Sequence, residues 1–225
     1  MKKLILLLIF APILCYSQVG LPYEIHALWN DFHLEKIKDG HNIAGTYEGS
    51  PYLHDNFLKG QILLEDGQLI KNAPLRYNAF TDNFEIEKDG LAYNIPKERA
   101  FKKFTYSNHD FIYSNYTEGN SKKSGYLIPR FNLKCSLYKH HKIILLHAKK
   151  AEAFKKAEPA KFITKPPVFM ITFNDHPPKV FKNHKQFIKL LPNMQKEMTK
   201  YINANKLKLK EETEIIQALE YYNTL

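Results

Sequence analysis

The sequence predicts an α+β protein built around an antiparallel β-meander, and three features support that fold class. Apolar and polar residues alternate with a period of two over much of residues 43–147. Asp66-Gly67 and Asp89-Gly90 each stand between apolar runs, as hairpin turns do, because glycine accepts the positive φ of a tight turn. Beyond residue 183 the apolar spacing becomes helical. We therefore expect a curved sheet or partly closed barrel, with an N-terminal helix and a small helical C-terminal region.

Residues 1–17 have the pattern of a secretory signal peptide. Lys2 and Lys3 precede an almost unbroken apolar run over residues 4–14, and Cys15-Tyr16-Ser17 offers small residues at the positions that a signal peptidase reads. Such a run is much shorter than the roughly 20 residues that a membrane-spanning helix needs. We expect cleavage after Ser17 and a chain that works in a bacterial periplasm or outside the cell.

A lipoprotein signal is the alternative for the same segment. Pro12-Ile13-Leu14-Cys15 resembles a lipobox, in which the cysteine carries the lipid. Leu14 is bulky where those signals have a small residue. The favoured product is therefore an unlipidated chain that begins at Gln18 and contains no transmembrane segment.

Removal of residues 1–17 leaves Cys135 as the sole cysteine, so no internal disulfide can form. Stability must then come from an apolar core. Cys135 shares the apolar side of an alternating stretch with Leu133 and Leu137, and we expect a buried thiol.

The chain is basic, with a formal net charge of +10 that falls to +8 without Lys2 and Lys3. Arg76, Arg99 and Arg130 are the three arginines among 33 basic residues. Lysine is a hydrated point charge, whereas bidentate recognition of phosphates and base edges is typical of arginine. Nucleic acid is thus not expected as a partner. The lysines either solvate the surface or bind an anionic surface weakly.

The sequence divides into three expected parts after the signal peptide. Residues 18–147 form a helix and the meander, with the helix over residues 24–38 and Gly40 as its C-cap. Residues 148–168, interrupted by prolines, are expected as an extended connector. Residues 169–225 begin with a short strand and continue as helices, of which the second is capped by Asn193. His140-His141 is expected at a hairpin tip.

No motif specifies a reaction, and neither a cofactor nor a metal site is expected. Phosphate-binding loops, nucleophile elbows, His-Glu-x-x-His and Cys-x-x-Cys are all missing. Aromatic residues on the strands without a catalytic set favour a non-catalytic envelope or secreted binding protein with an unknown partner. The alternative is a hydrolase that acts on an envelope or extracellular polymer through two carboxylates brought together by the fold.

Several blocks of the sequence resemble those of a family of uncharacterised exported bacterial proteins. They are Gly49-Ser50-Pro51-Tyr52-Leu53, Pro74-Leu75-Arg76-Tyr77-Asn78, Ala157-Glu158-Pro159-Ala160-Lys161-Phe162 and Tyr221-Tyr222-Asn223. The likeness spans most of the chain. It implies a shared architecture and no substrate or catalytic residue.

Arg76, Tyr77 and Asp55 are the candidate binding residues. Arg76 stands between two apolar strand residues, where a guanidinium needs an acidic partner if the outer face of the sheet is covered. Asp55 is the expected partner, because sequential elements of a meander lie side by side. A solvent-facing Arg76, or one that awaits an anionic ligand, are the alternatives.

Overall fold

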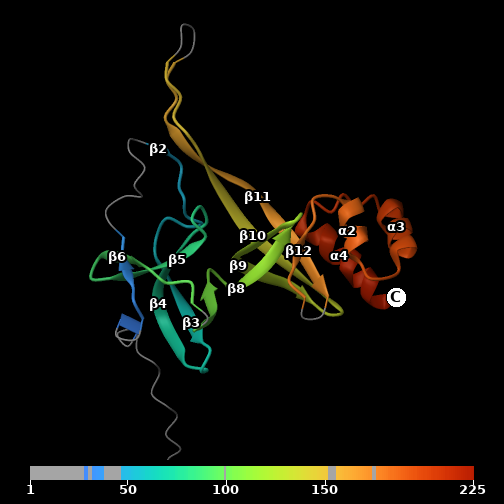
Figure 1. Cartoon of the computed structure of the whole chain (residues 1–225), viewed down its shortest axis with the longest axis horizontal. Coiled ribbons are helices and arrows are strands. Elements are labelled where there is room, and N and C mark those ends of the chain that lie inside the picture. The colour runs from blue at the N-terminus through green and yellow to red at the C-terminus, as the bar shows by residue number, and fades with distance from the viewer. Residues whose placement is uncertain (1–27, 30–31, 38–46, 99, 152–155, 174–175) are drawn as a thin grey trace, which may run out of the picture.

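The computed structural model describes residues 28–29, 32–37, 47–98, 100–151, 156–173 and 176–225 (Figure 1). Residues 1–17, expected as a signal peptide, lie outside this part. The described strands form a mostly antiparallel 12-stranded sheet, with three helices at the C-terminal end. The predicted α+β class is therefore confirmed.

The first part of the sheet is a meander in the order β1-β6-β5-β4-β3-β7. Gly67 and Gly90 have φ values of +89° and +72°, so both predicted glycine turns are confirmed. The strands are β1 (Glu35–Lys36), β3 (Leu58–Leu64), β4 (Leu69–Asn78), β5 (Asn83–Lys88), β6 (Leu91–Asn94) and β7 (Phe101–Tyr106).

The second part of the sheet curves into a ring. Strand β8 pairs with β7 through its first residues and with β9 from Ile112 onward, while the short β12 joins β8 to β11. The ring thus runs β8-β12-β11-β10-β9 and back to β8, as a partly closed barrel does. Its strands are β8 (His109–Glu118), β9 (Ser121–Asn132), β10 (Cys135–Leu146), β11 (Ala160–Phe173) and β12 (Lys179–Val180), and β2 (Tyr47–Glu48) pairs with β11 in parallel.

The expected connector over residues 148–168 is wrong over its second half. Ala160 already begins β11, which pairs with β10 along a long hairpin that projects from the body of the sheet (Figure 1). Pro166 and Pro167 lie at the irregularity where His140 pairs with Val168 and Lys142 with Lys165. A bulge accommodates residues that cannot donate a ladder hydrogen bond, so the strand continues through them.

Two further expectations need correction. Leu28 and Trp29 are helical, but the helix does not reach Lys38, because Glu35–Lys36 pairs with β6 at the edge of the sheet. The rest of the expected helix, 24–27 and 30–31, and Gly40 lie outside the described residues. His140-His141 is not a hairpin tip, since both residues lie within β10.

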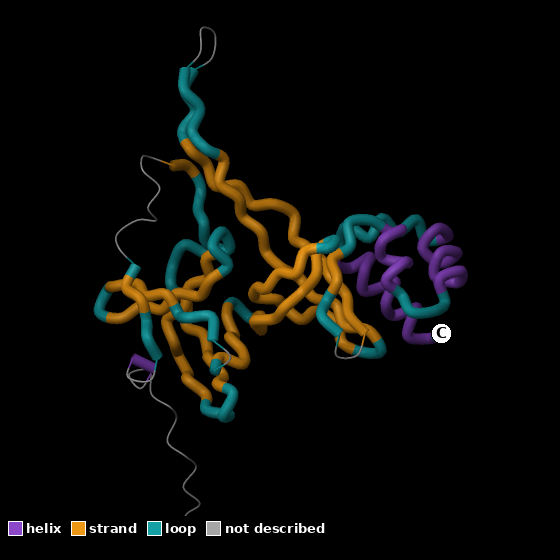
Figure 2. Tube along the Cα trace, in the orientation of Figure 1, coloured by secondary structure: helices purple, strands orange, loops and turns teal. Residues whose placement is uncertain are grey.

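The three described helices gather at one end of the molecule (Figure 2). They are α2 (His184–Leu190), α3 (Gln195–Ala204) and α4 (Glu212–Thr224). Their apolar residues, such as Phe187, Met198 and Leu219, pack with Leu137 and Ile171 of the ring strands. Among the described residues, no helix is long and apolar enough to cross a membrane.

The buried thiol is confirmed, since Cys135 is 1% exposed in the core beneath these helices. The expected cap of α3 is wrong. Met194, with a φ of +56°, takes the N-cap position without a side-chain hydrogen bond. Asn193 instead accepts a hydrogen bond of 2.7 Å from the Tyr222 hydroxyl, which ties α4 to the start of α3.

A layer of buried aromatic rings holds the meander to the ring. Phe84 stacks on Phe104 with 4.4 Å between the ring centroids, and Tyr126 of β9 meets both edge-on. Tyr77 packs against Phe84 and Phe111. This shared core fixes one face of β4 and β5, and the polar network described next lies on the other face.

Candidate functional site

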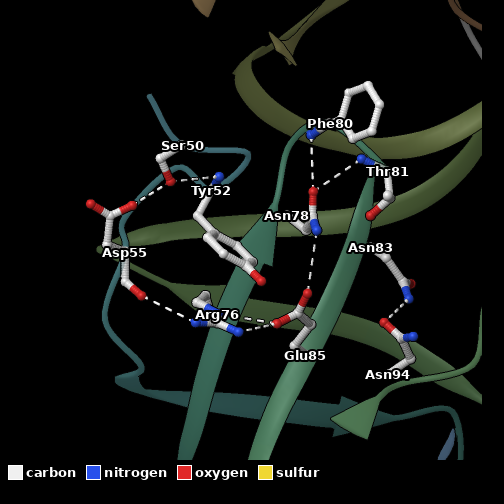
Figure 3. A network of polar contacts seen from close by, with 10 residues as sticks. All are labelled: Ser50, Tyr52, Asp55, Arg76, Asn78, Phe80, Thr81, Asn83, Glu85 and Asn94. Carbon is white, nitrogen blue, oxygen red and sulfur yellow. Dashed lines mark hydrogen bonds and ion pairs between the residues drawn. The ribbon is translucent and has the colours of Figure 1, made fainter. Parts of the chain in front are cut away.

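An ion pair between Arg76 and Glu85 stands at the centre of the candidate site (Figure 3). The two residues are directly opposite each other in the β4–β5 register. Nε and Nη2 of Arg76 donate to Oε2 of Glu85 over 3.0 and 2.6 Å. Glu85 is 1% exposed and the Arg76 side chain 17% exposed, so the pair is largely withdrawn from water.

The segment over residues 50–57 covers this pair. The Arg76 guanidinium carbon lies 3.8 Å from the ring centroid of Tyr52 and 4.3 Å from that of Phe57. Burial, followed by the negative charge of Glu85 and a hydrogen bond to it, raises the pKa of Tyr52 to about 12. Both rings therefore shield the guanidinium by cation–π stacking, and Tyr52 stays protonated at neutral pH.

Asp55 contacts Arg76, but not in the expected way. Nη1 of Arg76 donates to the backbone carbonyl of Asp55 over 3.3 Å. The Asp55 carboxylate accepts a hydrogen bond from the Ser50 hydroxyl instead. The predicted carboxylate partner was therefore wrong, because the cross-strand register places Glu85, and not Asp55, opposite the guanidinium.

Tyr77, the third candidate, points to the opposite face of β4. It is fully buried, and its hydroxyl donates to Oδ1 of Asp82 over 2.5 Å. Burial and the Asp82 carboxylate raise the pKa of Tyr77. Side chains alternate between the faces of a strand, so Tyr77 belongs to the aromatic core and not to the network around Arg76.

Asp82 joins the two parts of the sheet. With a φ of +53°, it accepts hydrogen bonds from the backbone N–H of Tyr126 in β9 at 3.2 Å, and its carboxylate lies 3.3 Å from Nε2 of His140 in β10. Nζ of Lys97 is 3.7 Å from its other oxygen. These contacts come from three separate segments, so the cluster serves to dock the β4–β5 turn on the ring.

Asn78 links Glu85 to the β4–β5 turn. Its Oδ1 accepts the backbone N–H groups of Phe80 and Thr81 at 3.2 and 3.1 Å, and its Nδ2 donates to Oε1 of Glu85 over 3.3 Å (Figure 3). Both carboxylate oxygens of Glu85 thus have structural partners. A carboxylate held in this way is poorly placed to exchange a proton with a substrate.

A cleft of about 500 Å³, here called the amide cleft, opens beside this network. Within it, Nδ2 of Asn83 donates to Oδ1 of Asn94 over 2.9 Å, and Oδ1 of Asn83 is buried without a partner among the described residues. The cleft is lined by side-chain amides, by carboxylates and by the ammonium group of Lys97. The lining residues are His33, Glu35, Ile37, Asn78, Thr81, Asn83, Glu85, Asn94, Ile95, Pro96, Lys97 and Glu98.

Sequence reasoning missed Glu85 and all three asparagines of the cleft. Arg76 and Glu85 lie on either side of the turn that joins β4 to β5, and a register drawn through that turn would have paired them. The sequence pattern gives no sign that Asn94 belongs to a binding site. The cleft around it is completed by β1 and by residues 95–98, which come together only when the chain folds. Among the described residues, no group of three His, Cys, Asp or Glu side chains is placed to hold a metal ion.

The comparisons with known proteins add no assignment. No family model, no curated protein and no solved structure matches this chain.

Proposed function

We propose that this chain is an exported, non-catalytic binding protein of the bacterial envelope or its surroundings, and that the amide cleft binds a neutral, polyhydroxylated ligand such as a saccharide unit. The observation that carries the proposal is a cavity of about 500 Å³ lined by the hydrogen-bonded amides of Asn83 and Asn94, next to Asn78, whose own amide is held by the β4–β5 turn and Glu85. Amides both donate and accept hydrogen bonds, and so do hydroxyl groups.

The charge of the lining disfavours an anionic ligand. Glu85 is paired with Arg76, and Lys97 lies 3.7 Å from Asp82, so both of these charges are compensated within the protein. The exposed carboxylates of Glu35 and Glu98 also line the cleft. An anionic ligand would therefore gain little from this cleft.

A hydrolase that uses two carboxylates is less well supported. Such an enzyme needs one acid that is held protonated in an apolar setting and can reach the substrate. Glu85 is buried, but its oxygens already face Arg76, Asn78 and Tyr52 and do not reach toward a substrate. Glu35 and Glu98 are exposed, so neither has the apolar setting that such an acid needs.

Binding is tested by titrating neutral oligosaccharides into the chain that begins at Gln18 by calorimetry. Asn94→Ala should weaken the binding of a hit about tenfold, as the loss of one good hydrogen bond does. The matched control is Asn120→Ala, which removes an exposed amide in the β8–β9 turn, away from the cleft. Equal affinity for Asn94→Ala and wild type would contradict the proposed site, and chromatographic detection of cleaved saccharide would favour the hydrolase.

Export is tested separately by intact-mass measurement of the protein from its host. The expected mass is that of an unlipidated chain beginning at Gln18, because Leu14 is unfavourable before a lipobox cysteine. A mass that includes acyl chains on Cys15 would overturn this expectation and place the protein on a membrane surface.

A further inference from the structure

The loop between α3 and α4 presents a regular alternation of leucine and lysine. Leu207 and Leu209 are 9% and 3% exposed and belong to the core beneath the helices. Lys206, Lys208 and Lys210 alternate with them and are all exposed. Two buried anchors thus hold a short segment so that its three lysines point to the solvent side.

Backbone contacts fix the course of this loop. The N–H of Leu207 donates to the carbonyl of Ile202 over 3.0 Å, and the N–H of Lys206 donates to that of Asn203 over 3.1 Å. Lys206 and Leu209 both have positive φ values, 52° and 54°, a conformation that non-glycine residues adopt only where the surroundings impose it. The lysine side chains therefore extend from a constrained backbone.

The three lysines surround a cavity of about 400 Å³, here called the lysine pocket. No carboxylate lines it. Lys182, which also lines it, pairs with Glu118 over 3.3 Å, whereas Lys206, Lys208 and Lys210 have no ion pair with any residue that the structure describes. The full lining is Lys182, Asn183, His184, Ile202, Asn203, Lys206, Leu207, Lys208 and Lys210.

The nearby carboxylate of Glu214 accepts a hydrogen bond of 3.2 Å from the backbone N–H of Lys210 and does not line the pocket. Several positive charges gathered in a lining without a carboxylate repel one another and attract an anion. We propose that the lysine pocket binds an acidic polysaccharide, whose repeated carboxylate or sulfate groups can reach several of these ammonium groups at once. The charged groups come from two separate segments, residues 182–184 and residues 206–210. A ligand with one charge would engage only part of this arrangement.

The lining itself disfavours two other anionic partners. It contains neither arginine nor a phenylalanine, tyrosine or tryptophan, the residues that most often read base edges and stack on bases, so nucleic acid is a poor match. None of the exposed large apolar residues among the described ones lines the pocket. Protein surfaces that insert into membranes combine basic with apolar side chains, so a lipid surface is also a poor match.

The proposal is independent of the amide cleft, which lies on the meander. Binding to immobilised polygalacturonate and chondroitin sulfate is measured by interferometry from about 50 to 300 mM salt, because screening should weaken a lysine-driven contact steeply over this range. Substituting Lys206, Lys208 and Lys210 together by serine should reduce affinity at least tenfold at the low-salt end and flatten the salt dependence.

A matched triple variant, Lys71→Ser, Lys102→Ser and Lys142→Ser, removes the same charge from exposed positions outside the pocket and should retain wild-type affinity within about twofold. Equal losses in both triple variants would overturn the proposal, because the attraction would then follow net charge alone. Absence of binding by the wild type would also overturn it. Vesicles with phosphatidylserine and double-stranded DNA are tested in parallel, and tighter binding to either one through the same lysines would assign the pocket to that partner instead.

Discussion

Arg76 and Glu85 form a cross-strand ion pair that is covered on its outer side by Tyr52 and Phe57. Loss of one partner leaves the other charged and withdrawn from water. We expect Glu85→Ala to lower the free energy of unfolding by about 3 to 5 kcal/mol, as the removal of one member of a buried pair does. Chemical denaturation of the single variants Arg76→Ala and Glu85→Ala, and of the double variant, measures this cost.

The double variant should be less destabilised than the sum of the two single variants, with a coupling of at least about 1 kcal/mol. Asp55→Ala serves as the control. It removes an exposed carboxylate that does not contact Arg76, so its effect should stay below about 1 kcal/mol. Additive effects of Arg76→Ala and Glu85→Ala would show that the pair contributes nothing to stability.

The Arg76 network shows how far sequence alone could lead. The position of Arg76 between Leu75 and Tyr77, both fully buried in the structure, predicts an acidic contact if the outer face of the sheet is covered, but it does not predict the cover itself. The identity of the acid does not follow, because the rule that sequential elements of a meander lie side by side favours Asp55, whereas the register of β4 and β5 places Glu85 opposite Arg76. Register depends on how many residues the turn at 79–82 uses, and a one-residue change alters every pair.

The length of β11 and the closure of the ring were also not predictable from local sequence patterns. Pro166 and Pro167 argue against a helix and leave an extended connector as the expectation, yet the bulge opposite His141 accommodates them within the strand β11. The fold class and the glycine turns rest on local patterns and were predictable. The pairing of β12 with β8 and the assembly of the amide cleft depend on contacts between distant segments, which period and turn signals do not contain.

Cys135 should be unreactive until the protein unfolds. Burial raises the pKa of its thiol to about 12, and the thiolate is the form that attacks disulfide reagents. In the chain that begins at Gln18, Cys135 is the sole cysteine, so labelling by a thiol reagent reports on this site alone. At pH 8 we expect labelling at the rate of unfolding, without a fast phase. A stoichiometric fast phase in native buffer would mean that the helices do not cover the strand.

His141 should make the stability depend on pH. Burial, and then the positive charge of Lys139, lower its pKa from 6.5 to about 4, with smaller contributions from His140, His109 and His54. The unfolded chain binds a proton near pH 6.5, whereas the native one resists it. The stabilisation is therefore complete above pH 6.5 and is lost as the pH falls toward 4, by about 2 kcal/mol at pH 5.

Urea denaturation at pH 7.5 and pH 5 measures this loss. His141→Gln removes the titrating group, so the difference in stability between the two pH values should shrink by about 2 kcal/mol. His147→Gln, which replaces an exposed histidine just beyond the end of β10, should keep the wild-type difference. Identical pH dependence of His141→Gln and wild type would show that the imidazole is hydrated in the native protein.

Gly49 lies where the chain leaves β2 and passes β11. Its φ is +75°, and a Cβ added to it would come within 2.6 Å of the backbone carbonyl oxygen of Phe162. A backbone atom cannot move aside as a flexible side chain can. Gly49→Ala should therefore combine the strain of a left-handed conformation with a clash that parts β2 from β11, at a total cost of about 3 kcal/mol or more.

Gly67 separates these two contributions. It also has a positive φ, +89°, but a Cβ there would meet nothing within 4 Å. Gly67→Ala should consequently cost only the conformational strain, about 1 to 2 kcal/mol, with no change in the packing of β11. Thermal denaturation of the two alanine variants compares the costs, and the difference between them measures the close approach of Gly49 to Phe162. If Gly49→Ala were no more destabilising than Gly67→Ala, then β2 would not lie against β11 in solution, and Gly49-Ser50-Pro51 would not be held in place from that side.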